Sequence, residues 1–168
     1  MASRPRQPKL LMNVTLRPAT IEDSRRVANL LIDTRAAFMP YAPSAHSDEE
    51  VRAWVASYLV PRGGVTVAEI KGQVMGIMAT EVKGEISWVV QMAIDPGLVS
   101  RGLGSLLLAH AVRTLTSPIR LHTFQANSRA RRFYERHGFI AIEFTDGQDN
   151  EERCPDVMYE YRPLRGEG

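Results

Sequence analysis

Apolar positions recur every three or four residues in the first third of the chain, and this spacing predicts two helices. The first follows a capping signature formed by Thr20 and Asp23, and the second follows a similar signature, residues 47–50. Pro40 and Pro43 end the first helix, because proline lacks the backbone N–H that a helix interior needs. We expect a short strand at residues 14–17, ahead of both helices.

The pattern then becomes strand-like. Three runs rich in β-branched residues follow, at residues 65–69, 74–81 and 85–94. The turn-forming pairs Lys71-Gly72 and Lys83-Gly84 separate them. Because short turns of this kind join neighbouring strands, the three runs should form an antiparallel meander.

The last third mixes both patterns. Its predicted elements are a helix at 103–115, a strand at 119–124, a helix at 128–136, and late strands at 139–144 and 157–161 around a polar loop at 145–155. The helix at 103–115 connects the strand at 85–94 to the strand at 119–124 as a crossover, so these two strands should be parallel. The order predicts one α/β domain with a mixed sheet over residues 14–168, after a disordered tail at residues 1–13.

Composition narrows the possible partners. The net charge of the 168 residues is only +2, so the overall electrostatic field gives no argument for nucleic-acid binding. The single cysteine, Cys154, excludes an internal disulfide and suits a reducing compartment. No apolar run approaches the roughly 18–20 residues that span a bilayer. We therefore expect a cytoplasmic protein without a membrane partner.

The most informative segment joins an apolar strand to an apolar helix, at residues 94–104. Gly102 and Gly104 lie where the helix should begin, and glycine lets a ligand approach the backbone closely. The first N–H groups of a helix have no intrahelical partner and favour anions, so this segment predicts a phosphate pocket. A dinucleotide fingerprint does not fit, because Leu107 stands where its third glycine belongs, and no Walker A triplet occurs.

Two motifs together resemble the GCN5-related N-acetyltransferases. Gly102 and Gly104 match the glycines of the family's coenzyme A pyrophosphate loop, Q/R-x-x-G-x-G/A, although Val99 replaces the usual Gln or Arg. Residues 127–139 match its N-x-x-A-x-x-x-Y-x-x-x-G-F segment. The resemblance spans roughly residues 14–161. It implies a mostly antiparallel sheet, flanked by about four helices, whose fourth and fifth strands splay apart.

The resemblance also implies acetyl-coenzyme A as cosubstrate and a set of residues that bind it. The implied coenzyme-binding residues are Met92, Ala93, Ile94, Val99, Ser100, Arg101, Gly102, Leu103, Gly104, Ser105, Asn127 and Tyr134. In the family, residues at the end of the fourth strand pair with the pantetheine arm, and the glycine loop holds the pyrophosphate. An ordinary apolar strand at 92–94 and a helix N-cap at Asn127 are the structural alternatives.

Tyr134 is the implied catalytic residue. Amine attack on a thioester releases a thiolate, and a phenol with a pKa of about 10 keeps a proton to donate at neutral pH. The alternative is a packing role, because Ala130, Phe133 and His137 share its helical face. No general base is assigned, since Trp88 stands where some family members carry a glutamate on the fourth strand.

Other polar residues give weaker signals. Three arginines share one helical face and either meet a coenzyme phosphate or form a solvated surface: Arg129, Arg132 and Arg136. The four histidines and Cys154 lack metal-ligand spacing, so we expect no metal.

The favoured function is acetyl transfer to the primary amine of a small molecule, by direct attack in a ternary complex. Phe38, Met39, Tyr41 and His46 would line the acceptor site. A protein or peptide amine is the alternative acceptor, and a non-catalytic coenzyme A-binding module is an alternative of a different class. A homodimer is a further possibility, because the family often dimerises.

Overall fold

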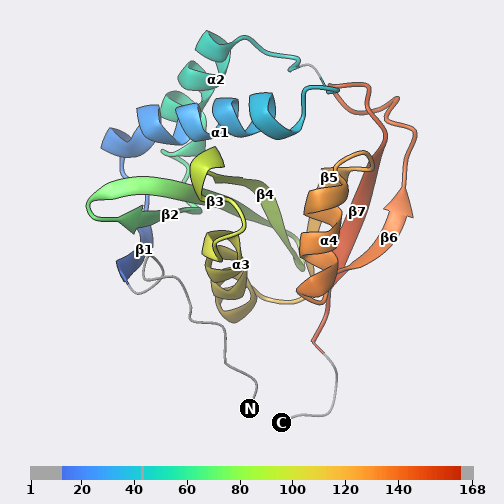
Figure 1. Ribbon diagram of the computed structural model, residues 1–168. Coiled ribbons are helices and arrows are strands. Elements are labelled where there is room, and N and C mark those ends of the chain that lie inside the picture. The colour runs from blue at the N-terminus through green and yellow to red at the C-terminus, as the bar shows by residue number, and fades with distance from the viewer. Residues whose placement is uncertain (1–12, 43, 164–168) are drawn as a thin grey trace, which may run out of the picture.

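The computed structural model describes residues 13–42 and 44–163, and in them seven strands form one sheet (Figure 1). The strands are β1 (Val14–Pro18), β2 (Val65–Ile70), β3 (Gln73–Lys83), β4 (Ile86–Ile94), β5 (Ile119–Phe124), β6 (Ile140–Phe144) and β7 (Asp156–Tyr161). The main helices are α1 (Ser24–Phe38), α2 (Asp48–Trp54), α3 (Leu103–Thr114) and α4 (Ser128–Arg136). Short helical turns are Ile21–Asp23, Val55–Leu59 and Pro96–Leu98.

The sheet confirms the predicted meander and crossover. Its strand order is β1-β2-β3-β4-β5-β7-β6, and β4 with β5 is its parallel pair. These two strands pair only at Ser87 with Ile119 and at Trp88 with Arg120, and they then separate. The predicted splay between the fourth and fifth strands is therefore confirmed.

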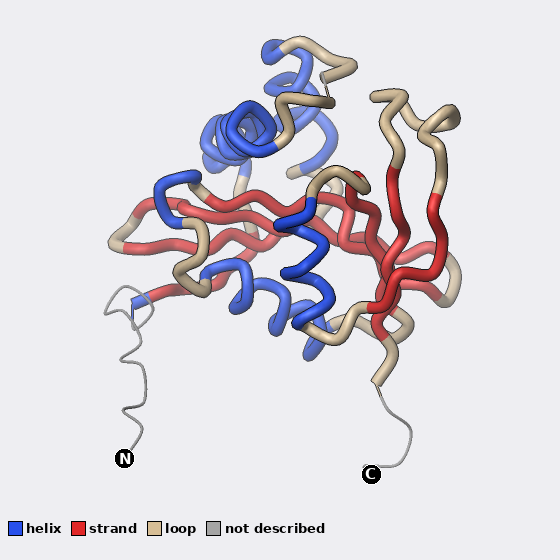
Figure 2. The backbone as a smooth tube through the Cα atoms, turned by 45° about the vertical axis from the view of Figure 1, so that its right-hand side comes forward, coloured by secondary structure: helices blue, strands red, loops and turns tan. Residues whose placement is uncertain are grey.

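Helices cover both faces of the sheet. Figure 1 shows α1 and α2 on one face and α3 with α4 on the other. The tube view in Figure 2 shows the same two layers. On the first face, Val27 and Leu30 of α1 pack with Leu59 against the β2–β4 meander. On the second, Leu107 and Leu108 of α3 are fully buried in a larger core with strands on both sides of the splay. Each face thus has its own core, and the core on the α3 and α4 face includes residues of both β4 and β5.

Local signals set the helix boundaries. Ser47 caps α2 by accepting a hydrogen bond from the N–H of Glu50 at 3.2 Å, and Asp23 accepts one from the N–H of Thr20 at 2.7 Å. The second apolar stripe differs from the prediction in one respect, because α2 ends at Trp54 and the chain continues in the wider π-helical turn Val55–Leu59. Residues 1–12 of the predicted tail, Pro43 and residues 164–168 lie outside the described residues.

Candidate active site

The splay of the sheet begins next to a bulge in β4. Across the β3–β4 pair, Gln91 faces Ala79 and Val89 faces Thr80, so Val90 is an extra residue in β4. Beyond this bulge the β5 side of β4 has no pairing strand among the described residues. Backbone polar groups that lose a ladder partner must find another one. The strand therefore presents free backbone groups along the gap.

Register identifies which backbone groups face the gap. Asp95 donates its N–H to the carbonyl of Met75 at 2.8 Å, and alternate residues of an antiparallel strand face the partner strand. It follows that the backbone groups of Ala93 face β3, whereas those of Met92 and Ile94 face the gap. The hydroxyl of Thr34 in α1 donates to the carbonyl of Ile94 at 3.2 Å. Of the three predicted backbone contacts, those at Met92 and Ile94 have the orientation that a ligand in the gap requires.

A cavity of about 1290 Å³, the main cavity, follows this gap. Its lining includes many of the predicted residues: Phe38, Met39, Met92, Ala93, Ile94, Val99, Ser100, Gly102, Gly104, Ser105, Asn127 and Tyr134. The remaining predicted residues are placed elsewhere. Leu103 is buried in the core and Arg101 is exposed beside the cavity, while Tyr41 packs edge-on against Phe124 with ring centroids 6.3 Å apart.

The glycine loop at one end of the main cavity is built to present backbone amides. Ser100 and Gly102 have positive φ angles, 62° and 90°, which turn the chain sharply into α3. No side chain caps the start of α3 at Gly102, so its first N–H groups stay available. Asp95 anchors the loop, because it accepts from the N–H of Gly97 at 2.9 Å and pairs with Arg26 at 2.8 Å. The hydrogen bond from Arg26 lowers the pKa of the Asp95 carboxyl.

Gly104 lines the main cavity and also has a packing role that its motif did not indicate. A Cβ at this position would lie 3.2 Å from the ring of Phe133 in α4. The missing side chain therefore lets α3 and α4 approach each other closely. His137, which directly follows α4, contacts α3, because its Nε2 lies 2.9 Å from the hydroxyl of Ser105.

Asn127 and the arginines of α4 border the main cavity. The side chain of Asn127 accepts from the N–H of Ala130 at 3.2 Å, so the N-cap alternative holds for its amide oxygen. Arg129 donates to the hydroxyl of Ser100 at 2.6 Å, and its guanidinium carbon lies 4.9 Å from the ring centroid of Phe38. With Arg132 and Arg136 also in the lining, this end of the cavity carries the positive charge that suits phosphates.

Tyr134 both packs and borders the main cavity. Its ring centroid lies 5.3 Å from that of Phe133, 5.9 Å from that of Phe139 and 6.2 Å from that of Tyr159. Burial among these rings raises the pKa of the Tyr134 hydroxyl to about 12. The phenol therefore keeps its proton at neutral pH. The side chain of Tyr134 therefore packs against neighbouring rings and also borders the main cavity, so the two roles considered for it are compatible.

A second cavity of about 730 Å³, the acceptor cavity, adjoins the main one on the α1 and α2 face. Both cavities share these lining residues: Thr34, Arg35, Met39, Gln91, Met92, Ala93 and Glu152. His46 borders only the acceptor cavity. A molecule in the acceptor cavity can therefore reach the gap beside β4.

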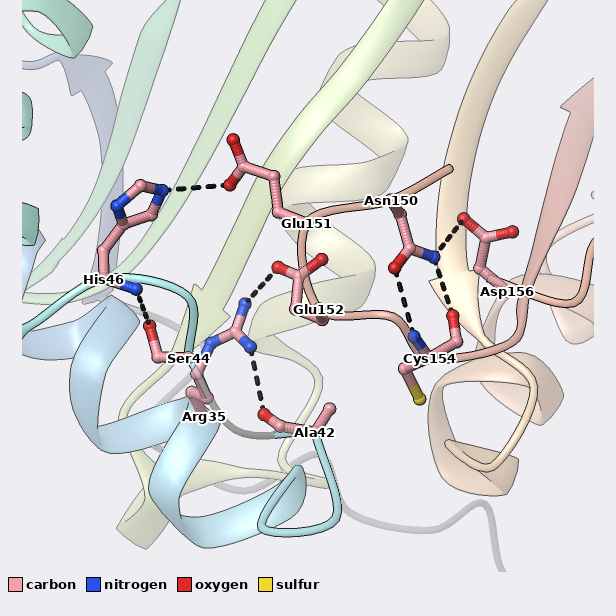
Figure 3. Close-up of polar contacts among 9 residues, drawn as sticks. All are labelled: Arg35, Ala42, Ser44, His46, Asn150, Glu151, Glu152, Cys154 and Asp156. Carbon is pink, nitrogen blue, oxygen red and sulfur yellow. Dashed lines mark hydrogen bonds and ion pairs between the residues drawn. The ribbon is translucent and has the colours of Figure 1, made fainter. Parts of the chain in front are cut away.

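Two side-chain bridges, here called the latch, join α1 and the α1–α2 linker to the β6–β7 loop (Figure 3), and their four residues line this cavity. Arg35 reaches Glu152 at 3.2 Å, and Nε2 of His46 reaches Glu151 at 3.0 Å. The other ring nitrogen of His46 lies 3.0 Å from Glu50 of α2. The carboxylates of Glu50 and Glu151 raise the pKa of His46.

The loop that carries the latch is braced internally. The side chain of Asn150 bonds both the N–H and the carbonyl of Cys154, at 3.1 and 2.7 Å (Figure 3). The sequence predicts His46 at the acceptor site but does not identify its loop partners. The available signal was charge, because the late loop carries Glu151 and Glu152 and the opposite segment carries Arg35 and His46.

Other kinds of site receive no support. In residues 13–42 and 44–163, no group of three or more histidine, cysteine or acidic side chains is arranged to hold a metal ion. Cys154 is a free, partly buried thiol. Within the same ranges, none of the helices combines the length and apolarity needed to cross a bilayer.

Comparisons with known proteins agree with this geometry. The acetyltransferase (GNAT) family model matches residues 31–139, which is more than half of the chain. No match was found among curated proteins.

Solved structures share the whole architecture. YjaB of Escherichia coli superposes with a TM-score of 0.71 at 20% identity, over 90% of this chain and 99% of its own. PaiA N-acetyltransferase of Thermoplasma acidophilum, in complex with coenzyme A, gives 0.71 at 16% identity, over 90% and 100%. The ribosomal-protein-S18-alanine N-acetyltransferase of Escherichia coli gives 0.68 at 17% identity, over 92% and 96%. The chain thus belongs to the acetyltransferase (GNAT) family and is an acetyl-coenzyme A-dependent N-acetyltransferase.

Proposed function

We propose that this enzyme transfers the acetyl group of acetyl-coenzyme A to the primary amine of a small molecule. The observation that carries the choice of acceptor is the latch, whose residues line the acceptor cavity and connect α1 and the linker to the β6–β7 loop. A peptide chain lying across the cleft would have to displace both bridges. We expect a compact amine to enter the cavity of about 730 Å³ with both bridges in place.

The reaction is a direct transfer in a ternary complex. The gap-facing backbone groups of Met92 and the N–H of Ile94 are suited to the amides of the pantetheine arm, and the uncapped start of α3 is suited to the pyrophosphate. The acceptor nitrogen attacks the thioester carbonyl carbon, a C–N bond forms and the C–S bond breaks. The hydroxyl of Tyr134 donates a hydrogen bond to the departing sulfur, which takes up a proton that the acceptor nitrogen loses and leaves as the thiol.

An amine-panel assay tests this proposal. We expect thiol release from acetyl-coenzyme A to be stimulated by one class of small amines and much less by peptides with free termini or lysines. Each amine should be offered at equal concentration, and heat-inactivated enzyme gives the background. Preferential turnover of peptides would contradict the small-molecule assignment and favour the protein or peptide alternative.

The latch should depend on the charge of His46. A pKa raised in the folded state means that folding favours the protonated ring, so the bridge is complete at low pH. It weakens as pH rises through the folded-state pKa of His46. We expect His46→Gln to raise amide exchange of the β6–β7 loop by roughly two- to fivefold at pH 6, the scale for an exposed ion pair.

Hydrogen exchange read by mass spectrometry on peptides covering residues 145–155 provides this measurement. Asp48→Asn is a matched control, because Asp48 also borders the acceptor cavity but forms no ion pair with the loop in the described part of the chain. Equal exchange in wild type and His46→Gln at pH 6 would mean that this bridge does not hold the loop.

A further inference from the structure

His122 occupies a distinctive position on β5. It lies two residues beyond Arg120, the last β5 residue paired with β4, and therefore at the point where the strands separate. Among the residues that the structure describes, it is the only histidine that lines the main cavity. Its ring stacks on Trp88 of β4, with centroids 5.3 Å apart and planes 18° apart. This contact holds the imidazole at the opening of the gap.

The side chain of His122 lies on the acceptor face of the sheet. It shares that face with Trp88, whereas Leu121, its neighbour in the chain, is buried in the core on the α3 and α4 side. Leu121 pairs with Tyr159, against which Tyr134 packs on that opposite side. His122 and Tyr134 therefore border one cavity from the two faces of the sheet.

The reaction needs a group in this place. A primary amine is mostly protonated at neutral pH and must lose a proton before its nitrogen can attack. Imidazole is the side chain best matched to proton transfer near neutral pH. Within the described residues, no hydrogen bond engages either ring nitrogen of His122, so one of them is free to accept a proton.

The other titratable groups of the main cavity suit this step less well. Arginines stay protonated throughout the working range of pH. Glu152 is paired with Arg35, and Asp156 accepts from the hydroxyl of Thr145. Carboxylates with an ordinary pKa of about 4 are also weak bases at neutral pH. The imidazole is thus the group with both the position and the chemistry.

We propose that His122 is the catalytic base that takes the proton from the acceptor ammonium. This rests on the proposed function. The free amine then attacks the thioester carbonyl, the C–N bond forms and the C–S bond breaks. The second nitrogen proton passes to the departing sulfur, which accepts a hydrogen bond from the hydroxyl of Tyr134. The base and this hydrogen-bond donor act from opposite faces of the sheet, so one side chain does not have to serve both ends of the reaction.

Several charged groups surround the imidazole and set its electrostatic environment. Arg120 lies two residues before His122 and therefore on the same face of β5. It forms an ion pair at 2.7 Å with Glu160, its cross-strand partner in β7. Met158 of β7 is the cross-strand partner of His122, and Glu143 of β6 faces Met158 in turn. Trp88 supplies the uncharged contact from β4. The substitution His122→Gln leaves all of these residues unchanged.

The test compares His122→Gln with wild type on two acceptors of similar shape. One is an alkyl amine that is protonated at pH 7, and the other is an alkoxyamine that is neutral there. We expect His122→Gln to lower kcat/KM for the alkyl amine roughly 10²-fold, the lower end of the range for general acid–base catalysis. The loss for the alkoxyamine should be less than about tenfold, because that acceptor is neutral and has no ammonium proton to lose before it attacks.

Controls separate this role from packing and from the proposed function. His110→Gln alters a histidine of α3 that lines neither cavity and should match wild type. Melting temperature and coenzyme affinity should be unchanged in His122→Gln. Equal losses for both acceptors, or no loss for the alkyl amine, would overturn the base assignment. Wild-type enzyme that acetylates neither these nor any other amine would contradict the proposed function itself, and the base with it.

Discussion

Tyr134→Phe should lower kcat roughly 10²-fold while coenzyme binding persists. The substitution keeps the ring that packs against Phe139 and Tyr159 and removes only the hydroxyl. Burial raises the pKa of this phenol to about 12, above the ordinary thiol value of about 8.5, so complete proton transfer to the thiolate is unfavourable. The hydroxyl then acts mainly as a hydrogen-bond donor to the developing thiolate. This places the loss at the lower end of the usual range of 10²–10⁴.

Steady-state kinetics on the purified variant measures this effect. The loss should appear in kcat more than in KM for acetyl-coenzyme A, because the interaction strengthens only in the transition state. A defect of packing would behave differently, with a lower melting temperature and weaker coenzyme binding together. Wild-type kcat in Tyr134→Phe would leave the tyrosine as a packing residue and require another proton donor.

Periodicity was enough to predict the elements of this fold. The β-branched runs and their glycine turns gave the meander, because both are local properties of the chain. The parallel β4–β5 pair followed from the handedness and length of a crossover. The splay between those strands came from the family resemblance, since no local pattern marks where β4 leaves β5. The bulge at Val90 has no sequence signal either, because valine suits a regular strand equally well.

Some parts of the candidate site could be predicted from the sequence, and others become visible only in the folded structure. The glycine loop and Tyr134 lie in contiguous motifs and could be recognised from one sequence. The latch could not, because His46 and Glu151 are 105 residues apart and meet only once the loop is placed over the cleft. His122 stood in an unremarkable strand. Its importance comes from register, which puts it beside the opening of the gap and opposite Tyr134.

Gly104 shows how one glycine can meet two structural requirements. Glycine fits a phosphate loop because the backbone must be approached closely, and it fits a helix crossing for the same reason. The structure shows the second kind of approach, with Phe133 as the neighbour. A side chain at Gly104 would therefore act on the coenzyme site by moving α4 rather than by filling the phosphate pocket.

Gly104→Val should weaken acetyl-coenzyme A binding by more than tenfold, or about 1.4 kcal/mol. A Cβ at this position already lies 3.2 Å from the ring of Phe133, and the two further methyl groups of valine leave the ring no room. The ring must move, and with it the part of α4 that carries Arg129 to Ser100 in the glycine loop. Isothermal titration calorimetry on the folded variant, with its melting temperature as a check, gives the affinity.

A second substitution identifies the cause of this loss. Phe133→Leu removes the far edge of the ring that the valine meets, so Gly104→Val combined with Phe133→Leu should recover most of the affinity lost by Gly104→Val alone. Phe133→Leu by itself provides the reference for the double variant. If the double variant binds as weakly as Gly104→Val, the valine blocks the phosphates directly. Unchanged affinity in folded Gly104→Val would remove the pyrophosphate from this end of α3 altogether, and the uncapped N–H groups there would need another explanation.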